Sequence, residues 1–210
     1  PQHRLYLPDY YLAKTPVTNA QYEAFVRAAG HRAPDNWANG KPPQGKENHP
    51  VVNVDWNDAL AFCHWASDVS GYDVQLPSEA EWEKGARGAD GRIYPWGDDW
   101  DAARCNTSES GVGATTPVAR YPQGASPYGL LDMAGNVWEW TRSLYQPYPY
   151  DPQDGRENLE ASDTRMVRGG SWASDQRGAR CACRYGYAPD DRFSILGFRV
   201  VVAPPISPRR

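Results

Sequence analysis

The chain has 210 residues and a net charge of −4, with 19 Gly, 19 Pro, nine Trp and 13 Tyr. The acidic balance argues against a binder of the nucleic-acid backbone, which needs a basic face to release counterions, and a mean hydropathy of −0.75 argues against a membrane span. The length suits one sizeable core, so we expect a single domain over residues 1–210.

The first half of the chain predicts one edge strand and three short helices. Residues 5–12 suit an edge strand because an internal proline cannot donate to a ladder. A capping box at Thr18 and apolar residues at helical spacing predict a helix that ends at Gly30. The same periodicity over 55–71 predicts a second helix, and Ser78 begins a third. Three helices would then cover a sheet.

Residues 87–100 form a region rich in glycine and aromatic residues. We interpret Trp96 and Trp100 as packing anchors, and a carbohydrate-binding platform is the alternative. Cys63 lies on the apolar side of the second predicted helix, where a small core residue is expected.

The stretch YGLLDMAGNVWEWT at 128–141 combines a sharp turn with a strand. Gly135 followed by Asn136 favours positive backbone angles, and 137–140 is rich in strand formers. Glu139 lies between two tryptophans, so its carboxylate needs a cation or several donors. We expect 137–140 and 197–202 to form central strands, because both are β-branched or aromatic and bounded by glycine.

Seven blocks of the sequence, in this order, resemble the formylglycine-generating-enzyme-like superfamily, the sulfatase-modifying factor domains. They are KTPVTNAQYEAFV at 14–26, HPVVNVDWNDALAFCHWAS at 49–67, LPSEAEWEKGARG at 76–88, YPWGDDW at 94–100, YGLLDMAGNVWEWT at 128–141, VRGGSW at 167–172 and LGFRVV at 196–201. The resemblance implies an α+β fold of the C-type-lectin-like class, of the formylglycine-generating-enzyme subtype. Such a domain is loop-rich, with short antiparallel strands and about three short helices.

The resemblance also implies a structural calcium site. Carried over residue by residue, its ligands are Asp132, Gly135, Val137 and Glu139. Carboxylates and backbone carbonyls are the oxygen ligands that calcium takes. The alternative is that arginines and backbone amides hold Glu139.

Formylglycine-generating enzymes use two cysteines that bind copper, and the positions that match them here carry Ser174 and Ala179. Cys181 and Cys183 lie nearby, but two residues apart in an extended chain their sulfurs point to opposite faces. The four histidines show no ligand spacing. We therefore expect no copper and no enzymatic activity.

Segment 173–195, ASDQRGARCACRYGYAPDDRFSI, resembles the variable region of diversity-generating retroelement target proteins. In that family template adenines are randomised, commonly in AAC codons, and the resulting codons never encode Gln, Glu, Lys, Met or Trp. The segment has a single Gln176 and none of the other four residue types. The resemblance implies a ligand-binding surface made of Ala173, Ser174, Asp175, Arg177, Gly178, Cys181, Cys183, Tyr185, Gly186, Tyr187, Ala188, Asp190, Asp191, Phe193, Ser194 and Ile195. The alternative is a solvated loop above buried aromatic side chains.

These observations favour a non-catalytic domain that displays a variable surface to a protein or another macromolecule. The alternatives are a copper oxidase that acts on a cysteine of a protein substrate, and a sensory or regulatory domain of a larger protein. The sequence opens without a signal peptide, which makes a cytoplasmic location the default. Pro1 is not a natural start, so surface display is expected instead if upstream sequence is missing.

Overall fold

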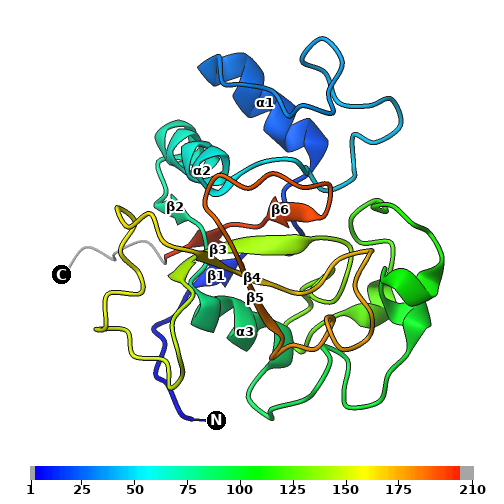
Figure 1. Ribbon diagram of the computed structural model, residues 1–210, viewed down its shortest axis with the longest axis vertical. Coiled ribbons are helices and arrows are strands. Elements are labelled where there is room, and N and C mark those ends of the chain that lie inside the picture. Colours follow the sequence, from blue (N-terminus) through cyan, green and yellow to red (C-terminus); the bar gives the residue numbers. More distant parts are fainter. Residues whose placement is uncertain (1–2, 204–210) are drawn as a thin grey trace.

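The computed structural model describes residues 3–203 (Figure 1). Its helices are α1 (Asn19–Ala29), α2 (Trp56–Ser70) and α3 (Glu79–Arg87), and three 3-10 turns span Ala102–Arg104, Ser108–Ser110 and Pro122–Gly124. Its strands are β1 (Tyr11–Leu12), β2 (Val74–Gln75), β3 (Trp138–Leu144), β4 (Arg165–Arg168), β5 (Arg184–Tyr187), β6 (Leu196–Phe198) and β7 (Val201–Val202). Within residues 3–203, no helix combines the length and the apolar character needed to cross a bilayer.

The three predicted helices are confirmed, and each begins at a capping box. The N-cap side chains of Thr18, Asp55 and Ser78 each accept a hydrogen bond from a backbone amide three residues further on, and the side chain of that residue accepts one in return. The first two helices end at Gly30 and Gly71, both in the left-handed region.

The strands form two sheets. One has the order β5-β4-β3-β6 and the other the order β1-β7-β2. β6 pairs with β3 in parallel, which departs from the expectation of antiparallel strands alone. The predicted run 197–202 is divided, because β6 belongs to the first sheet and β7 to the second. Of the predicted edge strand 5–12, only Tyr11–Leu12 pairs with a neighbour.

The four-stranded sheet separates two packing layers, with α1 and α2 on one side and α3 on the other (Figure 1). The larger apolar cluster joins α1 and α2 to the sheet through Trp138 and Trp140, and it includes Cys63, as predicted. Trp82 of α3 centres a smaller cluster with Leu130, Met133 and other residues. The α+β class and the C-type-lectin-like architecture inferred from the sequence are therefore confirmed.

Candidate functional site

Segment 173–195 runs along the outer edge of the four-stranded sheet. Among residues 3–203, its strand β5 pairs with β4 alone, and Tyr185 lies opposite Val167 and Arg184 opposite Arg168. Successive side chains of a strand point to opposite faces. Tyr185 and Tyr187 therefore lie on the face toward α1 and α2, and Arg184 lies on the face toward α3.

An aromatic patch covers the first of these faces. We define it as Trp138, Tyr185, Tyr187 and Phe193. The ring centroids of Tyr185 and Tyr187 are 5.0 Å apart, those of Tyr187 and Phe193 are 5.3 Å apart, and those of Trp138 and Tyr185 are 5.9 Å apart. Tyr185 is 51% exposed and Phe193 is 42% exposed, whereas Trp138 is buried. Rigid aromatic side chains on a packed base are the kind of contact that dominates recognition surfaces.

Two arginines hold the segment to the rest of the protein. The Nε and Nη2 groups of Arg184 donate to the two carboxylate oxygens of Glu79 at 2.5 and 2.9 Å. Nη2 of Arg192 lies 2.5 Å from Asp55 and 3.0 Å from Asp58, at the start of α2. Bidentate arginine contacts fix geometry more tightly than lysine contacts do. Neither arginine belongs to the predicted ligand-binding set.

The predicted ligand-binding residues differ in exposure. Eight are exposed, namely Ala173, Asp175, Arg177, Tyr185, Ala188, Asp190, Phe193 and Ser194. Seven are half-buried, namely Ser174, Gly178, Cys183, Gly186, Tyr187, Asp191 and Ile195. Three of the exposed residues precede β5 in the chain and four follow it, and the structure brings Tyr185 and Phe193 together at the aromatic patch.

Some members of the predicted set have structural roles. Cys181 is fully buried against the cluster around Trp82, and this position is therefore corrected from surface to core. A side chain at Gly186 would meet Thr164 at 2.6 Å and Tyr145 at 2.8 Å, which leaves little room for variation. The carboxylate of Asp175 accepts hydrogen bonds from two backbone amides of its own turn.

The positions that correspond to the copper-binding cysteines contain no thiol. The hydroxyl of Ser174 accepts a hydrogen bond from the Ser171 amide at 3.0 Å, and Ala179 is buried against Cys105. Burial raises the pKa of the Cys105 and Cys181 thiols to about 12, so both are protonated at neutral pH. These residues do not fit a copper–thiolate centre.

The two carboxylates predicted to bind calcium, those of Asp132 and Glu139, are already engaged with protein donors. Nε of Arg199 donates to Glu139 Oε2 at 2.6 Å, its Nη2 donates to Oε1 at 2.7 Å, and Trp82 Nε1 donates to Oε2 at 2.6 Å. One carboxylate oxygen of Asp132 accepts from the Ala119 amide at 2.8 Å. Because an arginine stands against Glu139, these residues as placed do not fit a calcium ion, and their contacts agree with the alternative of an arginine-bound carboxylate. Within residues 3–203, no cluster of three or more His, Cys, Asp or Glu side chains is placed to hold a metal ion.

The sequence reasoning missed an ion-pair network beneath the segment. Glu79 and Arg168 have fully buried side chains, and Nη2 of Arg168 lies 2.5 Å from Glu83. Together with Arg184 and Arg87 they connect α3 to β4 and β5. Side chains alternate along β4, so Arg168 lies on the face opposite Val167. This alternation is the feature of the sequence that could have indicated the network.

Comparisons with known proteins agree with this architecture. Residues 1–204 match the sulfatase-modifying factor enzyme 1-like domain. The formylglycine-generating enzyme of Streptomyces coelicolor is 34% identical over 259 residues, which cover 95% of this chain and 80% of that enzyme. The inactive C-alpha-formylglycine-generating enzyme 2 of Mus musculus is 39% identical over 166 residues, 71% of this chain and 48% of that protein. The structure of Treponema denticola variable protein 1 superposes with a TM-score of 0.78 at 26% identity, over 93% of this chain and 84% of that one.

Proposed function

We propose that this chain, which belongs to the sulfatase-modifying factor enzyme 1-like family, is a non-catalytic binding domain that presents segment 173–195 as a variable surface. The partner is a protein or another macromolecule. The likeness to a variable protein of Treponema denticola supports this proposal.

The observation that carries the proposal is that some residues of the segment fix its backbone while others are exposed. Arg184 and Arg192 are fixed by buried or nearly buried carboxylates on α3 and α2. The residues expected to vary include eight exposed side chains, with Tyr185 and Phe193 at the aromatic patch. A surface can change its side chains without loss of fold only if other residues hold its backbone, since exposed substitutions usually change stability by no more than about 0.5 kcal/mol.

A displayed library tests this division directly. The library randomises seven exposed positions, Ala173, Arg177, Tyr185, Ala188, Asp190, Phe193 and Ser194, and keeps Asp175, whose carboxylate accepts from two amides of its own turn. We expect most members to resist protease and to yield binders against an unrelated protein after selection. A matched library that randomises Cys181, Arg184 and Arg192 is expected to lose most of its protease-resistant members. Equal loss of folded members from both libraries would contradict the proposal.

The genetic part of the proposal has a separate test. A reverse transcriptase gene beside this one, with a near-copy of the coding sequence for the segment, is the expected genomic context. Adenines in that near-copy should align with the codons for the exposed residues and not with those for Arg184 and Arg192. A near-copy with adenines at the two anchor codons would contradict the assignment.

The second candidate is an oxidase, which the relationship to formylglycine-generating enzymes favours. Against it stand the serine and alanine at 174 and 179 and the buried, protonated thiols. Copper-loaded protein incubated with a cysteine-containing sulfatase-type peptide and oxygen should leave the cysteine unoxidised. Conversion of that cysteine to formylglycine, detected by mass spectrometry, would overturn the non-catalytic proposal.

A further inference from the structure

Strand β5 forms one edge of the four-stranded sheet (Figure 1). Among residues 3–203, no strand lies on the side of β5 that faces away from β4. An edge strand directs backbone N–H and C=O groups outward, where they can pair with a further strand. Peptide recognition often uses such an edge, because the backbone hydrogen bonds give affinity and the alternate side chains give specificity.

The register of the sheet shows which backbone groups of β5 point outward. Just after β3, the amide of Tyr145 donates to the carbonyl of Thr164 at 2.8 Å. Backbone groups of successive strand residues point to alternate sides, so Arg165 directs its own groups away from β3 and toward its β5 partner Tyr187. By the same alternation, the N–H and C=O groups of Gly186 point away from β4. Among residues 3–203, no backbone hydrogen bond outside the β-ladders involves this glycine.

Exposed aromatic rings flank this outward-facing glycine on both faces of the strand. On the α3 face, a side chain at Gly186 would meet the ring of Tyr145 at 2.8 Å, so this ring lies over the strand there. On the opposite face lie Tyr185 and Tyr187 of the aromatic patch. Tyr145 is 50% exposed and Tyr185 is 51% exposed, so each ring has area left for a ligand.

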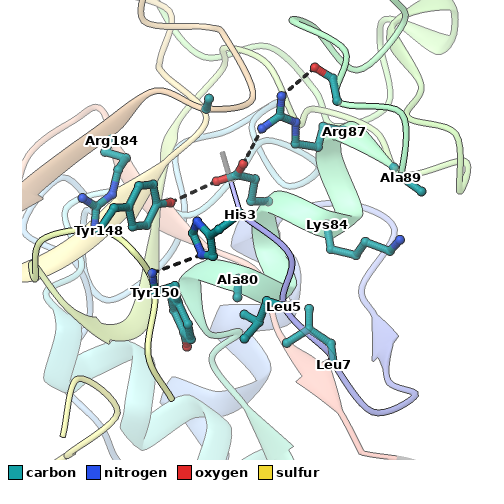
Figure 2. Close-up of a pocket in the computed structure, with 14 residues that line it drawn as sticks. His3, Leu5, Leu7, Ala80, Lys84, Arg87, Ala89, Tyr148, Tyr150 and Arg184 are labelled. Atoms are coloured by element: carbon teal, nitrogen blue, oxygen red, sulfur yellow. Dashed lines mark hydrogen bonds and ion pairs between the residues drawn. The ribbon is translucent and has the colours of Figure 1, made fainter. Parts of the chain in front are cut away.

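The edge is held in place from within the protein. Arg184 donates to both carboxylate oxygens of Glu79, and its Cζ lies 5.2 Å from the centroid of the Tyr145 ring. Figure 2 shows the same guanidinium beside Tyr148, with its Cζ 4.0 Å from that ring centroid. A site that is already fixed loses little conformational entropy when a partner binds.

We propose that this edge binds an extended segment of a partner protein as an additional strand of the sheet. The backbone of that segment pairs with Gly186. Its alternate side chains are apolar or aromatic, and they pack on Tyr185 and Tyr187 on one face and on Tyr145 on the other. The inference rests on the proposed binding function of segment 173–195 and names the form that its partner takes.

The arrangement separates a constant part of recognition from a variable part. Tyr145 lies outside segment 173–195, and a side chain at Gly186 would clash with it. Strand addition would therefore be common to all variants of the segment. The residues at 185 and 187 would select the side chains of the partner, because pockets for alternate side chains give specificity to an added strand.

A linear peptide selected against the full chain is the probe. Peptides are taken from a displayed library of random linear sequences, and one whose binding is lost with Tyr185→Ala is carried forward. Each of its backbone amides is then methylated in turn, which removes one N–H donor at a time. We expect the affinity to fall at least about tenfold, or about 1.4 kcal/mol, at alternate positions and to change little at the positions between them. Only every second residue of an added strand directs its amide to the sheet.

Two changes in the protein locate the added strand. Tyr145→Ala should weaken the peptide at least about fivefold, whereas Tyr72→Ala, at a tyrosine with similar exposure after α2, should leave its affinity unchanged. Replacement of Gly186 with N-methylglycine by chemical ligation removes the outward N–H without adding a Cβ, and it should weaken the peptide at least about tenfold. Circular dichroism and thermal unfolding check that each protein is folded.

Several outcomes would overturn strand addition. They are the recovery of no linear peptide that depends on Tyr185, methylation effects without alternation, unchanged binding to the protein with N-methylglycine at 186, and equal affinities for the Tyr145→Ala and Tyr72→Ala proteins. A peptide that depends on Tyr185 but shows no alternation would still support a binding surface at the aromatic patch. The proposed function and the mode of recognition can therefore fail separately.

Discussion

The two faces of the four-stranded sheet are built from different kinds of contact, although the side chains of both faces alternate along the same strands. Trp138 and Trp140 project toward α1 and α2 and join the large apolar cluster. Glu139, between them, projects toward α3 and meets Arg199, while Arg168 reaches the carboxylates of α3. The first face is held mainly by apolar contact, whereas the second adds buried ion pairs to the apolar cluster around Trp82.

The difference matters for the edge strand β5. Apolar packing has no fixed direction, so an exposed aromatic residue can be exchanged at small cost. A buried ion pair is different, because removal of one partner leaves the other charge unpaired in a low-dielectric site. Neighbouring residues Tyr185 and Arg184 should therefore respond very differently to substitution.

The largest effect is expected at the centre of the ionic face. Glu139→Ala should lower the free energy of unfolding by about 3–5 kcal/mol, because Arg199 and the Trp82 indole N–H would both lose their acceptor. Urea unfolding measures this loss. Glu160→Ala, on an exposed loop, should stay within about 0.5 kcal/mol. A loss of less than about 1 kcal/mol at Glu139 would show that the ion pair contributes little.

A smaller effect is expected at the edge of the same face. Arg184→Ala should cost about 2 kcal/mol, less than a fully buried pair, because its side chain is 16% exposed and Glu79 keeps Arg168 at 3.6 Å. Tyr185→Ala should cost about 1 kcal/mol or less, because its ring is half exposed. Thermal unfolding of the two variants compares them. Equal costs would mean that the two faces of β5 are constrained alike.

A still smaller effect on stability is expected at low pH. Burial alone would raise the pKa of Glu83, but Arg168 and Arg87 with the Tyr148 hydroxyl hold its pKa below the ordinary value of 4.5. Glu83 therefore stabilises the fold fully above pH 4.5, and this contribution is lost as the pH falls through the pKa of the folded state. Glu83→Gln should flatten the fall in melting temperature over that window. An unchanged slope would assign the acid sensitivity to other carboxylates.

The smallest effect is expected from calcium. Melting curves recorded with calcium and with a chelator should coincide, because Arg199 and Trp82 already satisfy Glu139. A ligand that binds only the folded state would raise the melting temperature. A rise with calcium that Asp132→Ala removes would restore the calcium site to the segment around Glu139.

The sequence by itself determined the local structure. Capping boxes and helical periodicity located α1, α2 and α3, because a helix start depends on residues within one turn of it. Gly135 and Asn136 both have positive φ, because glycine has no Cβ and asparagine tolerates the left-handed region. The blocks also indicated the family, which the match over residues 1–204 shows.

Only the tertiary structure decided the partners of the charged residues. Glu139 meets an arginine 60 positions away, and Arg184 meets Glu79 across 105 positions. No local pattern encodes such pairs, because they form only when separate strands and a helix pack together. The same reason explains why 197–202 divides between two sheets and why Cys181 lies in the core. Spacing along the chain shows which face a side chain takes, but packing determines what it meets there.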